Sequence, residues 1–497
     1  MTSTRRRILA LILALMLTAA PALAARSSPT ATPNPEPEAT LDPNAPEYDP
    51  EHPEELSADQ LYAWSAILIE AESGKPIFEK NADDIRYPAS LTKMMTGLLA
   101  IIAFPDGLDF DVTCSETAVA VNDTDDNLST LHLQAGEVIN FYDLVCATLI
   151  YSADDGANVI AETVSGSIEN FVATMNQAAE LYGCTNTHFM NAHGLHDDNH
   201  YTTPRDMAII AREAMSNDTF RQIVAMSSYT FGTSLRRSRT IRSTNELFNP
   251  GTETSSNKYY FPDSIGIKTG TTSKAQYCFA GAAERDGVEL ISVVMYTGKR
   301  SRWADTIKLM NYGFSQYVSV TPQELYAMNP ITIEVSRYSL NDPNMGRLSL
   351  SCVPQDSQAA ADAHIIATHD DVENMAATLR TTALIQYTRD FTAPISAGEV
   401  MGTMSYFIEG RYEPVVYNLL ATRSVRVREN IPKTLEQLAE EVRNEANPYG
   451  RVWRMLAPFI AVAALILLVL IWRFVKRLRK RRRRRVRIPS INRLRGH

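Results

Sequence analysis

The chain is 497 residues long, 45% of them hydrophobic and 21% charged, which is enough material for a sizeable buried core. Its net charge of -9 hides an asymmetry, because thirteen Lys and Arg residues follow residue 472 and three arginines lie near the amino end. Subtracting +13 and +3 from -9 leaves -25 for residues 25–472, and so acidic a body excludes nucleic acid as the substrate.

The amino end is typical of a secretory signal. Arg5 to Arg7 precede an apolar run from Ile8 to Ala20, and Ala22-Leu23-Ala24 is a small-x-small cleavage pattern. We expect residues 1–24 to be removed, since the apolar run is short for a bilayer span, although an uncleaved anchor would also export the chain. Residues 25–56 are rich in proline and poor in apolar side chains, which predicts a linker.

Residues 57–318 alternate strand-like and helix-like stretches and are predicted to form the larger, catalytic domain. Residues 63–69 and 74–78 are predicted to form a hairpin. A buried helix is predicted to begin near Pro88, because its apolar residues recur at intervals of three and four. Residues 288–295 follow the turn signal Asp286-Gly287 and are expected to pair with residues 276–283.

The carboxyl-terminal third begins with short alternating runs separated by Asp, Asn, Pro and Gly. This pattern predicts a small all-β domain, a β-sandwich, over residues 319–430. Residues 431–454 are predicted to form a polar helix and linker. We find no internal repeat.

Met455 to Trp472 is eighteen residues without a charge, which predicts a transmembrane helix. The basic tail that follows, residues 473–497, is expected to stay cytoplasmic, so the body of the chain would lie outside the cell membrane. The same arginines could form a nucleic-acid arm, but their place beside the span favours membrane orientation and contact with anionic lipid.

Ser90-Leu91-Thr92-Lys93 lies at the start of the predicted buried helix, where residues three apart share a face, so the hydroxyl and the amine can touch. A serine becomes a strong nucleophile when a base takes its proton, and a lysine can be that base if its pKa is lowered. Alone the pattern is weak, because Ser-x-x-Lys recurs by chance, as in Ser255-Ser256-Asn257-Lys258.

Two further elements strengthen this interpretation. Lys268-Thr269-Gly270 ends a strand-like run, where a cation can lower the pKa of Lys93 and attract a substrate carboxylate. The alternative for that lysine is an ordinary place on a strand edge. Ser152 follows an apolar segment and offers a second hydroxyl that can pass a proton to a leaving amine, although alone it would be only a helix-capping serine.

In order and broadly in spacing, these elements resemble the Ser-x-x-Lys, Ser-x-Asn and Lys-Thr-Gly set of penicillin-binding proteins and serine β-lactamases. The chain closely resembles one branch, the low-molecular-mass penicillin-binding proteins that are serine-type D-alanyl-D-alanine carboxypeptidases, the peptidase S11 family. The resemblance covers roughly residues 58–430. Its further motifs are Pro88-Ala89 before Ser90, Asn191-Ala192-His193-Gly194-Leu195, His200-Tyr201-Thr202-Thr203, Arg205-Asp206-Met207-Ala208, Gly266-Ile267, Ser301-Arg302 and Leu309-Met310-Asn311-Tyr312-Gly313-Phe314.

The resemblance implies an α+β fold: a β-lactamase/transpeptidase-like catalytic domain, in which helices flank an antiparallel sheet, then the small all-β domain and the transmembrane helix. It implies a cell-wall hydrolase that removes the terminal D-alanine from peptidoglycan stem pentapeptides through an acyl-enzyme on Ser90. It also implies inhibition by β-lactams and no cofactor.

The resemblance also implies a role for each site residue. Lys93 would take the proton of Ser90, and the backbone N–H groups of Ser90 and Thr271 would form the oxyanion hole. Ser152 would relay a proton to the departing D-alanine. The substrate would be bound by Lys268, Thr269, Gly270, Arg302 and Asp154, and the fork of Arg302 suits a carboxylate.

Asp154 departs from the family pattern, which has Asn at this position. An anion near Lys93 raises the pKa of the amine, the wrong direction for a base. Either Lys268 compensates, or Asp154 is protonated or turned away, or activity is reduced. A weakly active or inactive penicillin-binding scaffold protein is therefore the alternative. A β-lactamase is a further one, although no Glu-x-x-Leu-Asn deacylation element occurs between Asp155 and Ile267.

The cysteines and histidines give no sign of a metal site. The five cysteines lack the close pairs of a metal ribbon or redox dithiol, and one or two disulfides remain open. His193 and His200 lie in polar turns without metal-ligand spacing, so we expect structural roles for them.

Overall fold

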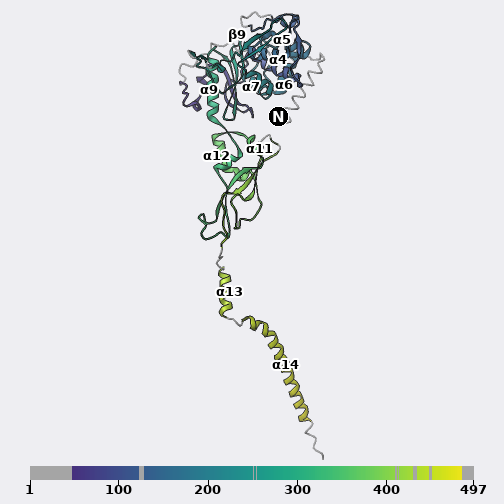
Figure 1. Ribbon diagram of the computed structural model, residues 1–497, viewed down its shortest axis with the longest axis vertical. Helices are drawn as coiled ribbons and strands as arrows, with labels where there is room; N and C mark the ends of the chain where they lie inside the picture. The colour runs from purple at the N-terminus through teal and green to yellow at the C-terminus, as the bar shows by residue number, and fades with distance from the viewer. Residues whose placement is uncertain are drawn as a thin grey trace, which may run out of the picture. The chain divides into compact units, whose positions relative to one another are not determined.

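The structure is a computed structural model that describes residues 47–121, 128–249, 251–252, 255–408, 411, 413–428, 434–446 and 450–483 (Figure 1). The predicted signal, most of the predicted linker and the tail from residue 484 onward lie outside the described residues. The chain divides into two compact units: the first runs to Ile331 and includes Ser349–Arg389 and Val400–Ala421, and the second contains the other residues. The predicted domain boundaries stay predictions.

A five-stranded antiparallel sheet forms the centre of the first unit, with strand order β2-β1-β11-β10-β9. Its strands are β1 (Ser65–Glu70), β2 (Pro76–Lys80), β9 (Ser264–Thr272), β10 (Gln276–Arg285) and β11 (Val288–Thr297). Both predicted strand pairings are confirmed. Every residue of β1 is buried, as expected for a strand with neighbours on both sides and helices on both faces.

Helices cover both faces of this sheet because successive residues of a strand point to opposite sides. Val294 belongs to one core cluster with Trp303 of α9 (Ser301–Gln316), whereas Val293 belongs to the other, with α2 (Lys93–Ala103) and α7 (Pro204–Met215). The predicted buried helix is thus confirmed, with a short 3-10 turn, η3 (Ala89–Thr92), before it.

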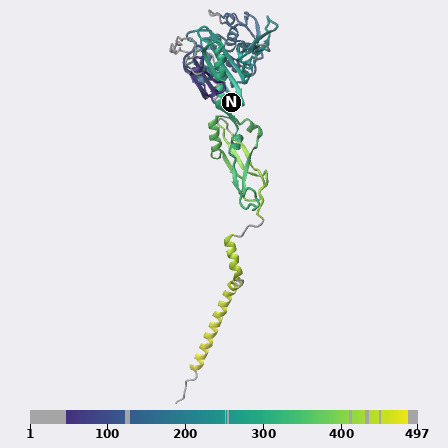
Figure 2. The ribbon, with the colours of Figure 1, turned by 90° about the vertical axis from the view of Figure 1, so that its left-hand side faces the viewer.

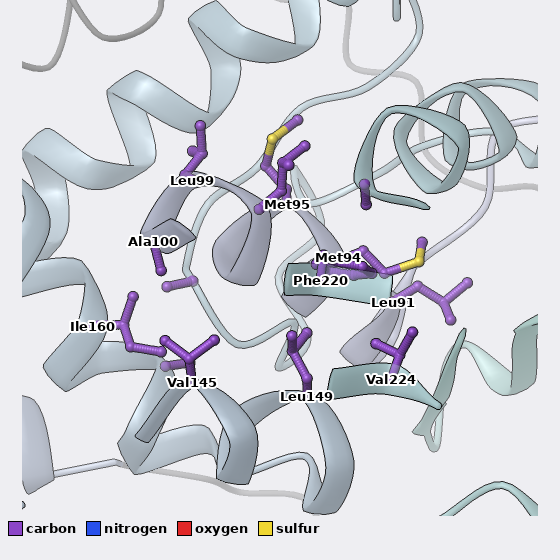
Figure 3. Packing of buried hydrophobic residues seen from close by; sticks show 14 of the residues in the cluster. Leu91, Met94, Met95, Leu99, Ala100, Val145, Leu149, Ile160, Phe220 and Val224 are labelled. Carbon is purple, nitrogen blue, oxygen red and sulfur yellow. The ribbon is translucent and has the colours of Figure 1, made fainter. Parts of the chain in front are cut away.

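Helix α2 is apolar around most of its circumference, as a helix inside a core must be. Figure 3 shows its Met95, Leu99 and Ala100 near side chains of neighbouring helices. Leu149 packs so closely that a methyl group at Gly97 would lie 2.7 Å from its Cδ2. This packing fixes the helix on which Lys93 is the first residue.

The other elements around the sheet are mostly helices and two-stranded pairs. They are η1 (Pro53–Glu55), η2 (Ala58–Gln60), β3 (Asp111–Thr113), α3 (Glu116–Val119), β4 (Val138–Asn140), α4 (Phe141–Cys146), the π-helix η4 (Ala147–Tyr151), α5 (Asp154–Ser165), α6 (Ile168–Tyr182), α8 (Asp218–Val224), β5 (Ser228–Phe231), β6 (Arg239–Arg242), η5 (Glu246–Phe248), β7 (Gly251–Thr252) and β8 (Ser255–Ser256).

The region predicted to be all-β contains strands and also helices, so that part of the prediction is corrected. The antiparallel strands β14, β18, β17 and β16 neighbour one another in this order, and β12 pairs with β15. Their bounds are β12 (Tyr317–Val320), β14 (Arg347–Pro354), β15 (Ile365–Thr368), β16 (Leu384–Tyr387), β17 (Val400–Tyr406) and β18 (Val415–Ala421).

The additional helices are α10 (Pro322–Met328), α11 (Ser357–Ala361) and α12 (His369–Thr382). Thr321 and Glu324 form a capping box at α10, and the Thr368 hydroxyl accepts from the Asp371 N–H at α12. These are ordinary helix-start signals.

The second unit includes β13 (Thr332–Glu334) and two helices near the carboxyl end, α13 (Leu435–Ala446) and α14 (Gly450–Arg483). Helix α13 confirms the predicted polar helix. Figure 2 shows the second as a long continuous helix at the yellow end of the chain. Its segment Met455–Arg479 is the one stretch in the described chain that is long and apolar enough to cross a membrane.

Candidate active site

Ser90 lies in the η3 turn immediately before α2, half-buried. Ala89 has a φ of 48°, a left-handed conformation that a non-glycine residue rarely adopts. Thr92 fixes the turn: its hydroxyl donates to the Ala89 carbonyl at 2.8 Å, and its Oγ1 lies 2.8 Å from Nε2 of His200. The nucleophile candidate is therefore held by a strained turn with buried hydrogen bonds behind it.

Lys93 is fully buried, and its Nζ makes three hydrogen bonds. It donates to Ser90 Oγ at 2.9 Å, to Asp154 Oδ1 at 2.6 Å and to the His193 carbonyl at 2.6 Å. The expected contact between Ser90 and Lys93 is thus present. Burial lowers the pKa of Lys93, and the nearby Asp154 and Asp155 act in the opposite direction.

Asp154 is the first residue of α5 and is 2% exposed. Its Oδ1 accepts from Lys93, and its Oδ2 accepts from the Ser129 N–H at 2.8 Å. The Asp154 N–H donates back to the Ser129 carbonyl at 2.7 Å. Of the possibilities that the sequence leaves open, a carboxylate turned away from Lys93 is therefore ruled out.

The carboxylate of Asp155, the next residue, has other hydrogen-bond partners than that of Asp154. Its carboxylate accepts hydrogen bonds from Thr130 Oγ1 and from the backbone N–H groups of Leu131, Leu133 and Gly156, at 2.6–3.0 Å. It therefore fixes the segment before α4 rather than Lys93.

Ser152 lies between the π-helix η4 and α5, with a left-handed backbone (φ 75°, ψ 34°) and 5% exposure. A π-helical turn is rare and is often found at functional sites. Ser152 closes η4 instead of capping α5, whose N-cap is Ala153. The structure thus places it two residues before the carboxylate that contacts Lys93.

Strand β9 brings Lys268, Thr269 and Gly270 to the Ser90 turn. A methyl group at Gly270 would lie 2.8 Å from the Pro88 carbonyl oxygen, so only glycine allows this approach. Lys268 is 1% exposed, and its Nζ donates to the Thr269 carbonyl at 2.9 Å. Burial first, and then the neighbouring Lys93, hold the pKa of Lys268 well below its usual value.

Arg302, on α9, reaches the end of the same strand. Its Nη1 lies 3.4 Å from Thr271 Oγ1, and its guanidinium carbon is 5.3 Å from the ring centre of Tyr277 and 4.4 Å from that of Trp303. Its Nε is buried without a hydrogen-bond partner in the part of the chain that the structure describes. Burial lowers the pKa of this guanidinium.

The turn formed by residues 191–195 supplies a contact to Lys93 that sequence reasoning missed. His193 contributes its backbone carbonyl to Lys93, and any residue type could do so. The available signal was Gly194, whose φ is +92° and where a methyl group would lie 2.0 Å from the Ala89 carbonyl oxygen. The structural roles expected for His193 and His200 agree with these contacts.

All five cysteines are buried and free, so the disulfides that the sequence left open do not form. Across the described ranges, no group of three His, Cys, Asp or Glu side chains could hold a metal ion.

A serine that contacts a buried lysine beside a Lys-Thr-Gly strand defines a class of serine acyl-transfer enzymes. Residues 52–298 match the family described as D-alanyl-D-alanine carboxypeptidase. The chain is 31% identical to the D-alanyl-D-alanine carboxypeptidase DacF of Bacillus subtilis over 277 residues, 55% of this chain and 67% of that protein. It is 28% identical to DacC of Escherichia coli over 406 residues, 80% of this chain and 88% of that protein.

Among solved structures, the Streptomyces K15 DD-transpeptidase is 31% identical, covering 52% of this chain and all of that one, with a TM-score of 0.47. From the sequence matches, the chain belongs to the D-alanyl-D-alanine carboxypeptidase family, peptidase S11. Its enzyme class is accordingly that of the serine-type D-Ala-D-Ala carboxypeptidases, which are penicillin-binding hydrolases of the cell wall.

Proposed function

We propose that this enzyme removes the terminal D-alanine from peptidoglycan stem pentapeptides through an acyl-enzyme on Ser90. The observation that carries the proposal is the 2.9 Å contact between Ser90 Oγ and the Nζ of fully buried Lys93. A buried amine with a lowered pKa is the kind of base that can activate a serine at moderate pH.

In the first step, neutral Lys93 takes the proton of Ser90, and Ser90 Oγ attacks the carbonyl carbon of the penultimate D-alanine. The backbone N–H groups of Ser90 and Thr271 stabilise the resulting oxyanion. One such donor is worth about a hundred- to a thousandfold in rate. The C–N bond then breaks, Ser152 relays the proton from Lys93 to the leaving amine, and D-alanine departs.

Water completes the cycle by hydrolysing the ester on Ser90, which restores the serine and releases the shortened peptide. A β-lactam enters the same first step, and its ring nitrogen is the leaving group that stays attached. We therefore propose that β-lactams acylate Ser90 and inhibit the enzyme.

The carboxylate of the departing D-alanine is assigned to Lys268, Thr269, Gly270 and Arg302. Arg302 Nε supports this assignment, because it is buried and has no hydrogen-bond partner among the described residues. The predicted role of Asp154 in substrate binding has less support, because both carboxylate oxygens already have partners within the protein.

Helix α14 supports a membrane anchor. We propose that the catalytic domain lies on the outer side of the cell membrane, where its cell-wall substrate is, and that the basic tail stays in the cytoplasm.

A second function is favoured by one contact. The 2.6 Å pair between Lys93 and Asp154 stabilises the charged amine, which cannot accept a proton. A weakly active or inactive penicillin-binding scaffold protein is therefore the alternative. A β-lactamase has less support, for want of the deacylation element noted above.

Release of D-alanine from a synthetic pentapeptide by the full-length protein in detergent tests the proposal. We expect release and covalent labelling by fluorescent penicillin, both abolished in Ser90→Ala. Ser255→Ala is the matched control, since it alters the other Ser-x-x-Lys sequence, and both activities should persist in it. Penicillin labelling without any D-alanine release would support the scaffold alternative.

A further inference from the structure

Asp154 is the feature of this site for which the assigned reaction has no use. We propose that Asp154 is a positioning residue for Lys93: it aims the amine at Ser90 and moves the pH range of Ser90 acylation toward alkaline values. This inference rests on the proposed function and assigns a determinant of its working pH.

The first argument is the geometry around Lys93 Nζ. An ammonium group has three N–H donors, and the structure supplies one acceptor for each: Asp154 Oδ1, the His193 carbonyl and Ser90 Oγ. A neutral amine has two N–H donors and one lone pair. The carboxylate and the carbonyl can only accept, so they take the two N–H groups. The lone pair must then face Ser90, whose hydroxyl can turn to donate.

The second argument is that this orientation is rigid. Asp154 cannot swing away from Lys93, because Ser129 holds both its Oδ2 and its backbone N–H, at 2.8 and 2.7 Å. The carboxylate is 2% exposed, so water does not screen its charge.

The third argument is the balance of charged groups that face Lys93. Asp154 and, at greater distance, Asp155 come from α5, and both favour the charged amine. Lys268 on β9 interacts with Lys93 in the opposite sense, with Arg302 of α9 beyond it. His193 is half-buried and His200 is buried, and burial lowers the pKa values of both. Asp154 is thus the one anion in this set that contacts the amine.

The sign of the effect follows directly. Lys93 must lose the proton that points at Ser90 before it can act as a base, and an anion at 2.6 Å opposes this loss. Replacing Asp154 by the neutral Asn removes the negative charge that stabilises the protonated amine. An opposite charge within hydrogen-bonding distance shifts a pKa by about one to three units, so the pKa of Lys93 should fall by about this amount. At a pH below the pKa of Lys93 in both wild type and Asp154→Asn, the variant should therefore be acylated about ten- to a thousandfold faster than wild type.

The experiment is the rate of acylation by fluorescent penicillin between pH 5 and 10, with the full-length protein in detergent. Wild type should show a rate that rises with pH, and in Asp154→Asn this acidic limb should move to lower pH by at least about one unit. The alkaline plateau should fall only severalfold, since the Asn oxygen still accepts from Lys93 while its amide loses the Ser129 N–H. Asp154→Ala should move the limb in the same direction but lose more of the plateau, because nothing then orients the amine.

Two results would overturn the inference. An unmoved limb in both variants would mean that Asp154 only supports the fold, and a limb moved to higher pH would mean that Lys93 passes its proton to Asp154 during the reaction. These outcomes differ from a failure of the proposed function, which would appear as absent D-alanine release in wild type and in every variant. Intrinsic tryptophan fluorescence checks that the variants are folded.

Discussion

Acid should destabilise this enzyme because the buried side chain of His200 resists protonation in the folded protein. His200 is 2% exposed; its Nδ1 accepts from the Met190 N–H at 3.1 Å, and the ring packs edge-on against Phe189. Because Nδ1 accepts, the proton of the neutral ring lies on Nε2, which donates to Thr92 Oγ1 at 2.8 Å. Burial, with smaller contributions from His188, His196 and Lys93, lowers the pKa of His200 from 6.5 to about 3.

The sign and size of the effect follow from linkage. Below pH 6.5 the unfolded chain takes up a proton at His200 and the folded protein does not, so the free energy of unfolding falls as the pH falls toward 3. At 1.36 kcal/mol per pKa unit, this costs about 2 kcal/mol at pH 5 and about 4 kcal/mol at pH 3, where the folded protein is itself half protonated at His200. The stability is fully present above pH 6.5, and it is lost across the window between the two pKa values.

His200→Gln isolates this contribution, because the Gln amide can still donate to Thr92 but does not titrate. We expect the variant to be less stable than wild type at pH 7.5, since the Met190 N–H loses its acceptor, and to lose about 2 kcal/mol less than wild type between pH 7.5 and 5. Denaturant unfolding in detergent, followed by tryptophan fluorescence, measures both. His132→Gln, at an exposed position, is the control. Wild-type and His200→Gln stabilities that fall in parallel with acid would refute the reasoning.

Three other changes test the geometry of the site. Gly270→Ala places a methyl group 2.8 Å from the Pro88 carbonyl oxygen and 3.2 Å from the Leu91 nitrogen, so β9 must shift. A displacement near 1 Å should slow penicillin acylation about a hundredfold. A wild-type acylation rate would contradict the close approach of β9 to the Ser90 turn. Arg302→Lys removes a planar fork, so KM for the pentapeptide should rise more than kcat falls; an unchanged KM would remove Arg302 from substrate binding. Deletion of Met455–Arg479 should move the enzyme from the membrane to the soluble fraction without abolishing D-alanine release.

The sequence was most informative where the physics is local. A three-residue spacing at a helix start brought Ser90 and Lys93 together, and period-two strands with turn signals gave the correct pairing of β10 with β11. The helices α10 and α12 could also have been predicted, since their capping residues are present in the sequence. They were not predicted because the alternating apolar and polar runs around them indicated strands only.

Features that depend on distant parts of the chain were not predictable in this way. The π-helical turn and the left-handed backbone of Ser152 lie where η4 packs against several elements that are distant in sequence, α2 among them. The His193 carbonyl is a backbone group, and no residue type marks it. Whether Asp154 faces Lys93 or solvent was open because the two are separated by 61 positions, and Ser129 decides the matter through contacts that no local pattern encodes.

The two lysines of the site show why an acid at position 154 is compatible with substrate binding. Both are buried to a similar degree, yet Lys93 has a carboxylate partner at 2.6 Å, whereas the acceptor found for Lys268 in the described chain is the Thr269 carbonyl. A buried amine without an anion is costly to charge, and an arriving carboxylate reduces that cost. Under the proposed assignment, Lys268 is the lysine that gains most from the C-terminal carboxylate of the substrate, and Arg302 Nε gains a hydrogen bond from the same group. Because the anion of Lys93 is built into α5, the proposed binding of the substrate carboxylate falls to β9 and α9.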